Sequence, residues 1–269
     1  MTTAQPRKTV YFHVGLPKTG TTTVQAMLRE NAGRLADEGL YVMCTDPLLR
    51  AVNRQAGRIC KYGASDLAAR FRLALAARRL ASALKAVPQQ RVLVSDENLP
   101  GWRIDNLYRL PFDAGPRLGT RDAQAHMRSA HVFVTQQKGE TAEFDSWAAR
   151  VGEAGKIDRL VSDTRAYWGE AGHVFRMEDE VAAGGRWGHN ILAQAGVSQA
   201  VLDRLADVDT ANSGVPKGLL PFVRRVNALN LEDDARKAVV QVLRDLREDV
   251  MLAANSETAD QHPVARGER

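Results

Sequence analysis

The sequence has only two cysteines and no long apolar run. Cys44 and Cys60 lie too far apart for a compact metal-binding pair and are too few for a disulfide framework. Nowhere do about eighteen apolar residues follow one another. The first residues, MTTAQPRKTVYF, pass from polar positions into a strand pattern without a charged-then-apolar leader. We therefore expect a cytoplasmic protein in a reducing compartment, without a membrane span.

Nucleic-acid-binding modules and large runs of one charge are also missing. The formal net charge is +5 and the pI about 9.4, which is compatible with an anionic ligand but does not establish one. Basic pairs such as Arg78-Arg79 and Arg224-Arg225 stand where helix surfaces are expected. We therefore expect no nucleic-acid partner.

Segments with strand character alternate with segments of helical spacing. A length of 269 residues favours a single domain that comprises residues 1–254 and contains a helical insertion at about 46–90, followed by a polar tail at 255–269. Helices are expected at about 22–38 and 65–87, up to Val151, over 157–170 and through most of the chain after Glu178. The segment 101–129 has weak periodicity and predicts a loop with a short helix. Strands are expected at 9–14, 40–44, 91–95, 131–135 and 173–177.

This alternation predicts a three-layer α/β/α fold with a mainly parallel central sheet. Ligands of such sheets bind beyond the carboxyl ends of the strands. The segments 17–23, 95–98 and 135–138 each follow a predicted strand. We therefore expect these three segments at one rim of the sheet, where a site would form.

The segment 17–23 has the outline of a phosphate-binding loop. Gly15 and Gly20 have Walker A spacing, but Thr21 stands where the lysine belongs and Lys18 lies inside the loop. A helix N-terminus offers unpaired N–H groups and partial positive charge to an oxyanion. The threonines add hydroxyl donors: Thr19, Thr21, Thr22 and Thr23.

The run HVGLPKTGTTTVQAMLREN resembles the 5′-phosphosulfate-binding loop of the sulfotransferases, whose hallmark is P-K-T/S-G-T-T/S. The matching residues are Pro17, Lys18, Thr19, Gly20, Thr21 and Thr22. The segment from His13 to Leu40 is also similar to bacterial sulfotransferase-like proteins. The resemblance implies a sulfotransferase fold of the P-loop type, 3′-phosphoadenosine 5′-phosphosulfate as donor, and in-line sulfuryl transfer to a hydroxyl or amine without a required metal. The acceptor would be a small molecule, a lipid or a carbohydrate.

The resemblance also implies a general base and a 3′-phosphate site. Glu97, in RVLVSDENL, resembles the glutamate of the S-x-E type in bacterial relatives, with Asp96 and His13 as alternatives. Lys18 would neutralise the charge that collects on the phosphate leaving group. The family binds the 3′-phosphate through an arginine at a strand end and a serine about eight residues later. After the expected strand at 131–135 this spacing gives Lys138 and Ser146.

Three explanations of the missing arginine stay open. Lys138 replaces it as a point charge, Arg224 or Arg225 fills its place, or donor binding is weakened or lost. A glycine-rich stretch with Lys217 is a further position for a loop that closes over the donor. The leading hypothesis is a sulfotransferase. The alternatives are a protein of the same fold that only binds a nucleotide or a partner, and a magnesium-dependent nucleotide kinase.

Overall fold

The computed structural model describes residues 8–62, 66–96, 112–152, 155–208, 215 and 217–245. Their contacts gather in two compact units. One, the sheet unit, comprises Met1–His126 and Glu153–Ala211, and the other, the helical unit, comprises Met127–Gly152 and Asn212–Arg269. The expectation of a single domain over 1–254 stays a prediction, and the expected tail at 255–269 lies outside the described residues.

A five-stranded parallel sheet forms the middle of the sheet unit, in the order β2-β3-β1-β4-β5. Its strands are β1 (Thr9–Gly15), β2 (Leu40–Cys44), β3 (Arg91–Ser95), β4 (Asp113–Thr120) and β5 (His173–Arg176). Residues of β1 alternate between the two faces of the sheet. Val10, Phe12 and Val14 belong to one apolar core, whereas Tyr11 packs against the other.

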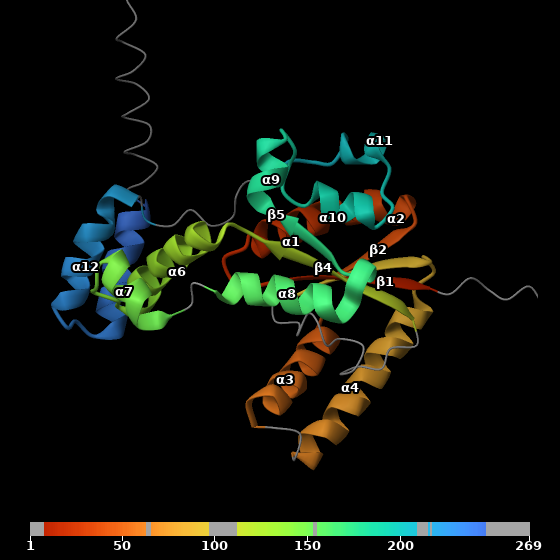
Figure 1. Ribbon diagram of the computed structural model, residues 1–269, viewed down its shortest axis with the longest axis horizontal. Coiled ribbons are helices and arrows are strands. Elements are labelled where there is room, and N and C mark those ends of the chain that lie inside the picture. Colours follow the sequence, from red (N-terminus) through yellow and green to blue (C-terminus); the bar gives the residue numbers. More distant parts are fainter. Residues whose placement is uncertain are drawn as a thin grey trace, which may run out of the picture. The chain divides into compact units, whose positions relative to one another are not determined.

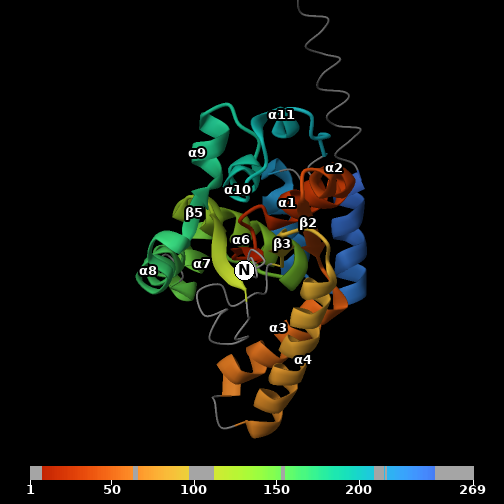
Figure 2. The ribbon, with the colours of Figure 1, turned by 90° about the vertical axis from the view of Figure 1, so that its right-hand side faces the viewer.

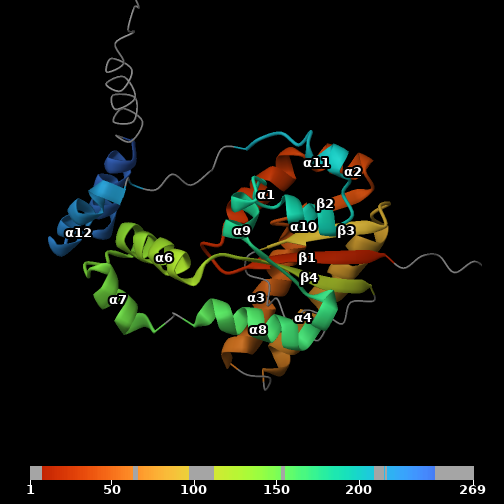
Figure 3. The same ribbon diagram turned by 45° about the horizontal axis from the view of Figure 1, so that its top comes forward.

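Helices cover both faces of this sheet, as Figure 3 shows. One face packs against α3 (Pro47–Tyr62), α4 (Leu67–Ala86) and α8 (Lys156–Trp168). The other packs against α1 (Thr21–Glu30), α2 (Ala32–Asp37), α10 (His189–Gln194) and α11 (Gln199–Leu202). A short 3-10 helix, η2 (Gly169–Ala171), precedes β5, and α9 (Met177–Ala182) follows it. The predicted three-layer α/β arrangement with a parallel sheet is therefore confirmed, and so are the helices of the insertion (Figure 1).

The fourth strand is not where the sequence pattern placed it. Residues 131–135 lie in helix α6 (Ala123–Lys138), and the strand is β4. In α6 the buried residues Met127, His131 and Thr135 are spaced four apart, so the β-branched run contributes one face of a helix.

Glycine and proline hid β4 from the sequence pattern. Pro116 pairs with Phe12 of β1, but the ladder to β5 begins only at Arg117. The missing N–H of Pro116 therefore costs no bond on the β5 side. Gly115 has no room for a side chain, because a Cβ there would lie 2.6 Å from the carbonyl oxygen of Ala171. Gly119 is tightly packed, and a Cβ there would lie 3.2 Å from the ring of Trp187.

A smaller correction concerns the helix expected at about 22–38. It is divided by Asn31, which is buried and donates through Nδ2 to the carbonyl oxygen of Met27. The same amide pairs with Ala206, whose N–H donates to Asn31 Oδ1 over 2.8 Å. The break therefore ties the end of α1 to the segment after α11.

The helical unit contains the rest of α6 together with α7 (Phe144–Val151), η3 (Lys217–Leu219), α12 (Leu220–Ala228) and a helix at 233–245. Its small core comprises Val215, Val223, Val240 and Leu243. His131 of α6 packs against α7: its ring centroid lies 5.2 Å from that of Trp147. Its Nε2 donates to the carbonyl oxygen of Ala142, just before α7.

Candidate functional site: the loop between β1 and α1

The chain passes from β1 into α1 through residues 16–20. Gly15 closes β1 beside Gly119 of β4, and the backbone is left-handed at both Lys18 (φ 73°) and Gly20 (φ 79°). Gly20 is the N-cap of α1 and has no side chain to cap the helix. The first N–H groups of α1 therefore face the loop without a side-chain acceptor at the N-cap, and the helix dipole adds partial positive charge there.

The threonines of the loop fall into two groups. Thr19 is buried, and its Oγ1 donates to the carbonyl oxygen of Leu16 over 2.7 Å. Thr21 is buried as well, whereas Thr22 and Thr23 are partly exposed in the first turn of α1. Thr19 thus holds the loop closed upon itself, and the partly exposed pair is better placed to meet a ligand. Pro17 is exposed at the outer side of the loop.

Arg121 joins this loop to the end of β4. Its Nη1 donates to the carbonyl oxygen of Lys18 over 3.3 Å, and its Nε donates to Glu178 Oε1 over 3.3 Å. The other oxygen of Glu178 accepts the backbone N–H of Asp122. His126, on the first turns of α6, donates through Nε2 to the carbonyl oxygen of Pro17. Two cationic side chains, Lys18 and Arg121, therefore come from the ends of neighbouring strands.

Trp187 supports the loop from the opposite side. Its indole Nε1 donates to the carbonyl oxygen of Gly20, and the ring packs so closely that a Cβ on Gly20 would lie 2.5 Å from Nε1. The turn that bears Trp187 is held by the buried carboxylate of Glu180, which accepts the N–H groups of Gly188 and Asn190. The conformation of Gly20 is thus fixed by residues far along the chain.

The end of β3 contributes a buried polar pair. His13 Nδ1 and Ser95 Oγ are 2.8 Å apart, and His13 Nε2 has no hydrogen-bond partner among the residues that the structure describes. Burial lowers the pKa of His13 to about 4, so this imidazole is neutral at neutral pH. It adds no positive charge to the loop, and its burial at mid-strand argues against its use as a base. Asp96 is buried beside it, and Glu97 lies outside the described residues.

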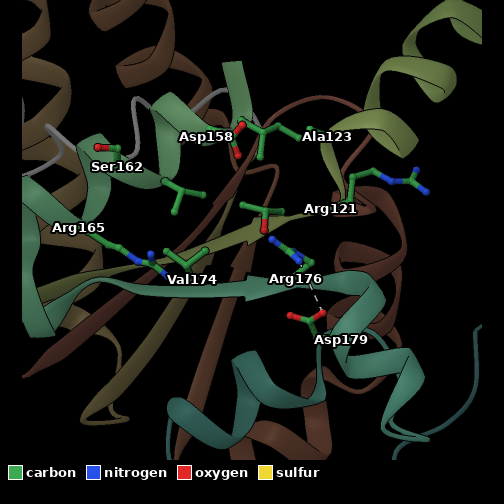
Figure 4. Close-up of a pocket in the computed structure, with 11 residues that line it drawn as sticks. Arg121, Ala123, Asp158, Ser162, Arg165, Val174, Arg176 and Asp179 are labelled. Carbon is green, nitrogen blue, oxygen red and sulfur yellow. Dashed lines mark ion pairs between the residues drawn. The ribbon is translucent and has the colours of Figure 1, made fainter. Parts of the chain in front are cut away.

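A pocket of about 540 Å³ opens at the carboxyl ends of β4 and β5. In Figure 4, Arg165 and Arg176 reach along β5, and Arg121 extends toward α6. Arg176 lies 4.0 Å from Asp179 across an exposed ion pair, which contributes little to stability. The volume is that of an ordinary small-ligand pocket. It is lined by Thr120, Arg121, Ala123, Ile157, Asp158, Val161, Ser162, Arg165, Val174, Arg176 and Asp179.

Lys138 and Ser146 stand in a different setting from the one expected. Lys138 is the last residue of α6 and Ser146 lies on α7, both exposed and both in the helical unit. The carbonyl oxygens of Thr135, Gln136 and Gln137 there accept donors from Asn227 and Arg236. The segment 135–138 is thus a helix C-terminus rather than a strand end, which disfavours an anion.

Arg224 and Arg225 are the arginines considered as replacements for the missing one, and both lie on α12. Arg224 forms an ion pair with Glu143, and Arg225 is exposed on α12. The side chain of Lys217 lies outside what the structure describes.

The sequence pattern missed Arg121 because it missed β4. With β4 ending at Thr120, Arg121 is an arginine directly after a strand, and Ser129 follows it by eight residues on α6. An arginine at a strand end followed by a serine eight residues later is the spacing that the resemblance to the sulfotransferases implies. The run LGTRD could have indicated the strand end, but its glycine weakens any strand prediction.

The arrangement is suited to holding an oxyanion. It combines a helix N-terminus, hydroxyl donors and two cations at the ends of adjacent strands, β1 and β4. Within the described ranges, no group of three or more His, Cys, Asp or Glu residues is placed to hold a metal ion. None of the helices described there is long and apolar enough to cross a membrane.

Comparison with known proteins adds two distant structural likenesses. No protein-family model and no curated protein matches the chain. The crystal structure of a sulfotransferase from Alicyclobacillus acidocaldarius has a TM-score of 0.46 and 17% identity, covering 89% of this chain and 97% of its own. The crystal structure of APE1195 has a TM-score of 0.37 and 16% identity, covering 74% of this chain and 99% of its own. At these values neither likeness carries an argument about function.

Proposed function

We propose that the protein is a sulfotransferase that uses 3′-phosphoadenosine 5′-phosphosulfate and transfers the sulfuryl group in line to a hydroxyl or amine. The observation that carries the proposal is the loop between β1 and α1. It has the sequence PKTGTT, a left-handed Gly20 at an uncapped helix N-terminus, and Arg121 in contact with it. The acceptor, a carbohydrate, lipid or small molecule, stays open.

In this proposal the loop binds the 5′-phosphosulfate. The N–H groups at the start of α1 and the hydroxyls of Thr22 and Thr23 would bind the phosphate oxygens. As the bond between sulfur and the bridging oxygen breaks, negative charge grows on the leaving phosphate, and Lys18 would stabilise it. Glu97 would take the proton of the acceptor. Loss of transfer in both Lys18→Ala and Glu97→Ala, with the fold retained, is the expected result.

We further propose that Arg121 binds the 3′-phosphate, in the place that sequence alone gave to Lys138 and Ser146. Arg121 stands at the end of the strand beside β1, and its guanidinium already touches the loop. A guanidinium also matches a phosphate by two parallel hydrogen bonds, which an ammonium cannot do. The pocket that Arg121 lines has the size and the polar rim to receive the nucleoside.

Calorimetric titration with 3′-phosphoadenosine 5′-phosphate and with adenosine 5′-phosphate tests this proposal. The two ligands differ only in the 3′-phosphate. Arg121→Ala should therefore lower the affinity for 3′-phosphoadenosine 5′-phosphate by roughly ten- to a hundredfold and leave the affinity for adenosine 5′-phosphate nearly unchanged. Lys138→Ala is the matched control and should change neither. An equal loss of affinity for both ligands in Arg121→Ala would mean that this residue only supports the loop.

Two other outcomes would favour the alternatives. Binding of ATP that requires magnesium, without preference for the 3′-phosphate, would indicate a nucleotide kinase. No binding of any of these nucleotides at millimolar concentration would indicate a protein that has kept the loop without its ligand. In that case a partner-binding function becomes the better hypothesis.

A further inference from the structure

Positive charge is concentrated in the hairpin of α3 and α4. The segment 47–87 contains 9 Lys and Arg residues and 1 Asp, a formal net charge of +8. The other residues contain 28 Lys and Arg against 31 Asp and Glu, a formal net charge of −3. The basic character of the protein therefore comes from this hairpin, and a local excess of positive charge of this size attracts anionic partners.

Helix α4 is apolar on two opposite sides. Leu73, Leu80 and Leu84 are buried in the core that the hairpin shares with the sheet. On the other side Leu67, Phe71 and Leu75 form a stripe at spacing four, with exposed fractions of 73%, 72% and 42%. Successive residues of a helix are separated by about 100°, which places the centre of this stripe nearly opposite the buried leucines.

Arginines flank the exposed stripe on both sides. The helical rotation places Arg70 on one flank, with Arg72 and Arg79 on the other, and all three are exposed. The stripe occupies the first half of α4, which is the end of the hairpin that lies away from the sheet (Figures 1 and 2). An apolar stripe of Leu and Phe between basic flanks, carried at the end of a projecting hairpin, has the composition of a helix that lies in a membrane interface.

We propose that this face of α4 docks the protein on an anionic lipid bilayer. Leu67, Phe71 and Leu75 would enter the boundary between headgroups and acyl chains, and the flanking arginines would meet the acidic headgroups. A second copy of the chain is a poorer occupant, because two faces of the same positive charge repel each other. A nucleic acid would satisfy the arginines but not the exposed leucines and phenylalanine.

Co-sedimentation with lipid vesicles tests this surface without any nucleotide, so the result is independent of the proposed transferase activity. The wild-type protein should bind phosphatidylcholine vesicles that contain about one third phosphatidylglycerol and should not bind pure phosphatidylcholine. Raising the salt from ~0.1 M to ~1 M, which shortens the Debye length from ~10 Å to ~3 Å, should release it.

Two double variants separate the two contributions. Leu67→Ser with Phe71→Ser should lower the vesicle partition coefficient at least about tenfold. Arg70→Gln with Arg72→Gln should lower the partition coefficient roughly twenty-fivefold, at about fivefold for each charge removed. The matched control is Val181→Ser with Arg159→Gln, which makes the same kinds of change at exposed positions elsewhere in the sheet unit and should leave binding unchanged.

Three results would overturn the proposal. The first is absence of binding to the anionic vesicles, or binding that both double variants retain. The second is a dimer in sedimentation equilibrium that the Leu67 and Phe71 changes abolish, because the face would then belong to a second copy. The third is tight binding of duplex DNA that is insensitive to those apolar changes, which would assign the arginines to a nucleic acid.

Discussion

The buried imidazole of His13 gives a prediction that the structure quantifies. Burial lowers the pKa of His13 to about 4, from an ordinary value of 6.5, and Nδ1 is engaged with Ser95. Between these two pH values the unfolded chain binds a proton at this residue that the folded protein does not. The unfolded state therefore gains stability as the pH falls from about 6.5 to about 4, and the free energy of unfolding decreases.

The magnitude follows from the difference of about 2.5 pKa units, which corresponds to roughly 3 kcal/mol over the whole window. Lowering the pH from about 7 to about 5 should remove about 2 kcal/mol of this. The assay is urea unfolding of the wild type and of His13→Asn at several pH values. Other titrating groups, including His173 and His189, whose pKa values burial also lowers, contribute to both proteins and cancel in the difference.

The pH dependence of His13→Asn should accordingly be shallower by about 2 kcal/mol over that range. Equal slopes for the two proteins would refute the reasoning. If the variant does not fold, titration of the His13 ring by NMR in the wild type answers the same question, because the ring should stay neutral down to about pH 4. A ring that titrates near 6.5 would show that water reaches it.

Three further predictions concern the contacts at the two ends of α1. Gly20→Ala forces a Cβ at φ 79° to within 2.5 Å of Trp187, so we expect a loss of about 1–3 kcal/mol in urea unfolding and of nucleotide binding in calorimetry. Trp187→Phe keeps an aromatic ring but removes the pyrrole part of the buried indole with its donor to Gly20, so nucleotide affinity should fall about fivefold and stability by about 1–3 kcal/mol. Asn31→Ala leaves the N–H of Ala206 unpaired and should lower the unfolding free energy by about 1–3 kcal/mol, whereas an unchanged value would mean that water replaces the amide.

The sequence predicted the parts of the fold in which local preference and tertiary environment agree. β1, β2, β3 and β5 have apolar β-branched residues in a parallel sheet, and the long alanine- and leucine-rich segment is helix α4. The prediction from sequence failed where local preference and tertiary environment disagree. The run HVFVT has strand propensity but continues a helix that begins at Ala123, whose first turn is capped by Asp122. Local propensity is weak enough to be overridden by such a context.

The candidate site divides in the same way. The loop could be identified from sequence because the groups proposed to bind the ligand are backbone N–H groups and neighbouring side chains, all within a few positions of Gly20. Arg121 could not be identified, because its position depends on a strand with glycine and proline that is stabilised by its pairing with β1 and β5. The roles of Lys138 and Ser146 stay predictions, and the titration of Lys138→Ala tests the first of them.

The geometry of the candidate site depends on contacts over long sequence distances, so the sequence of the loop alone does not determine it. Glu178 lies 57 residues after Arg121, yet it accepts the guanidinium Nε of Arg121 and the N–H of Asp122 together. One carboxylate thus fixes both the side chain of Arg121 and the backbone that follows it. Trp187, 167 residues from Gly20, fixes the other side of the loop. A chain with the same PKTGTT motif but without Glu178 and Trp187 would have the donors of an anion site without their orientation, and orientation is what gives such a site its affinity.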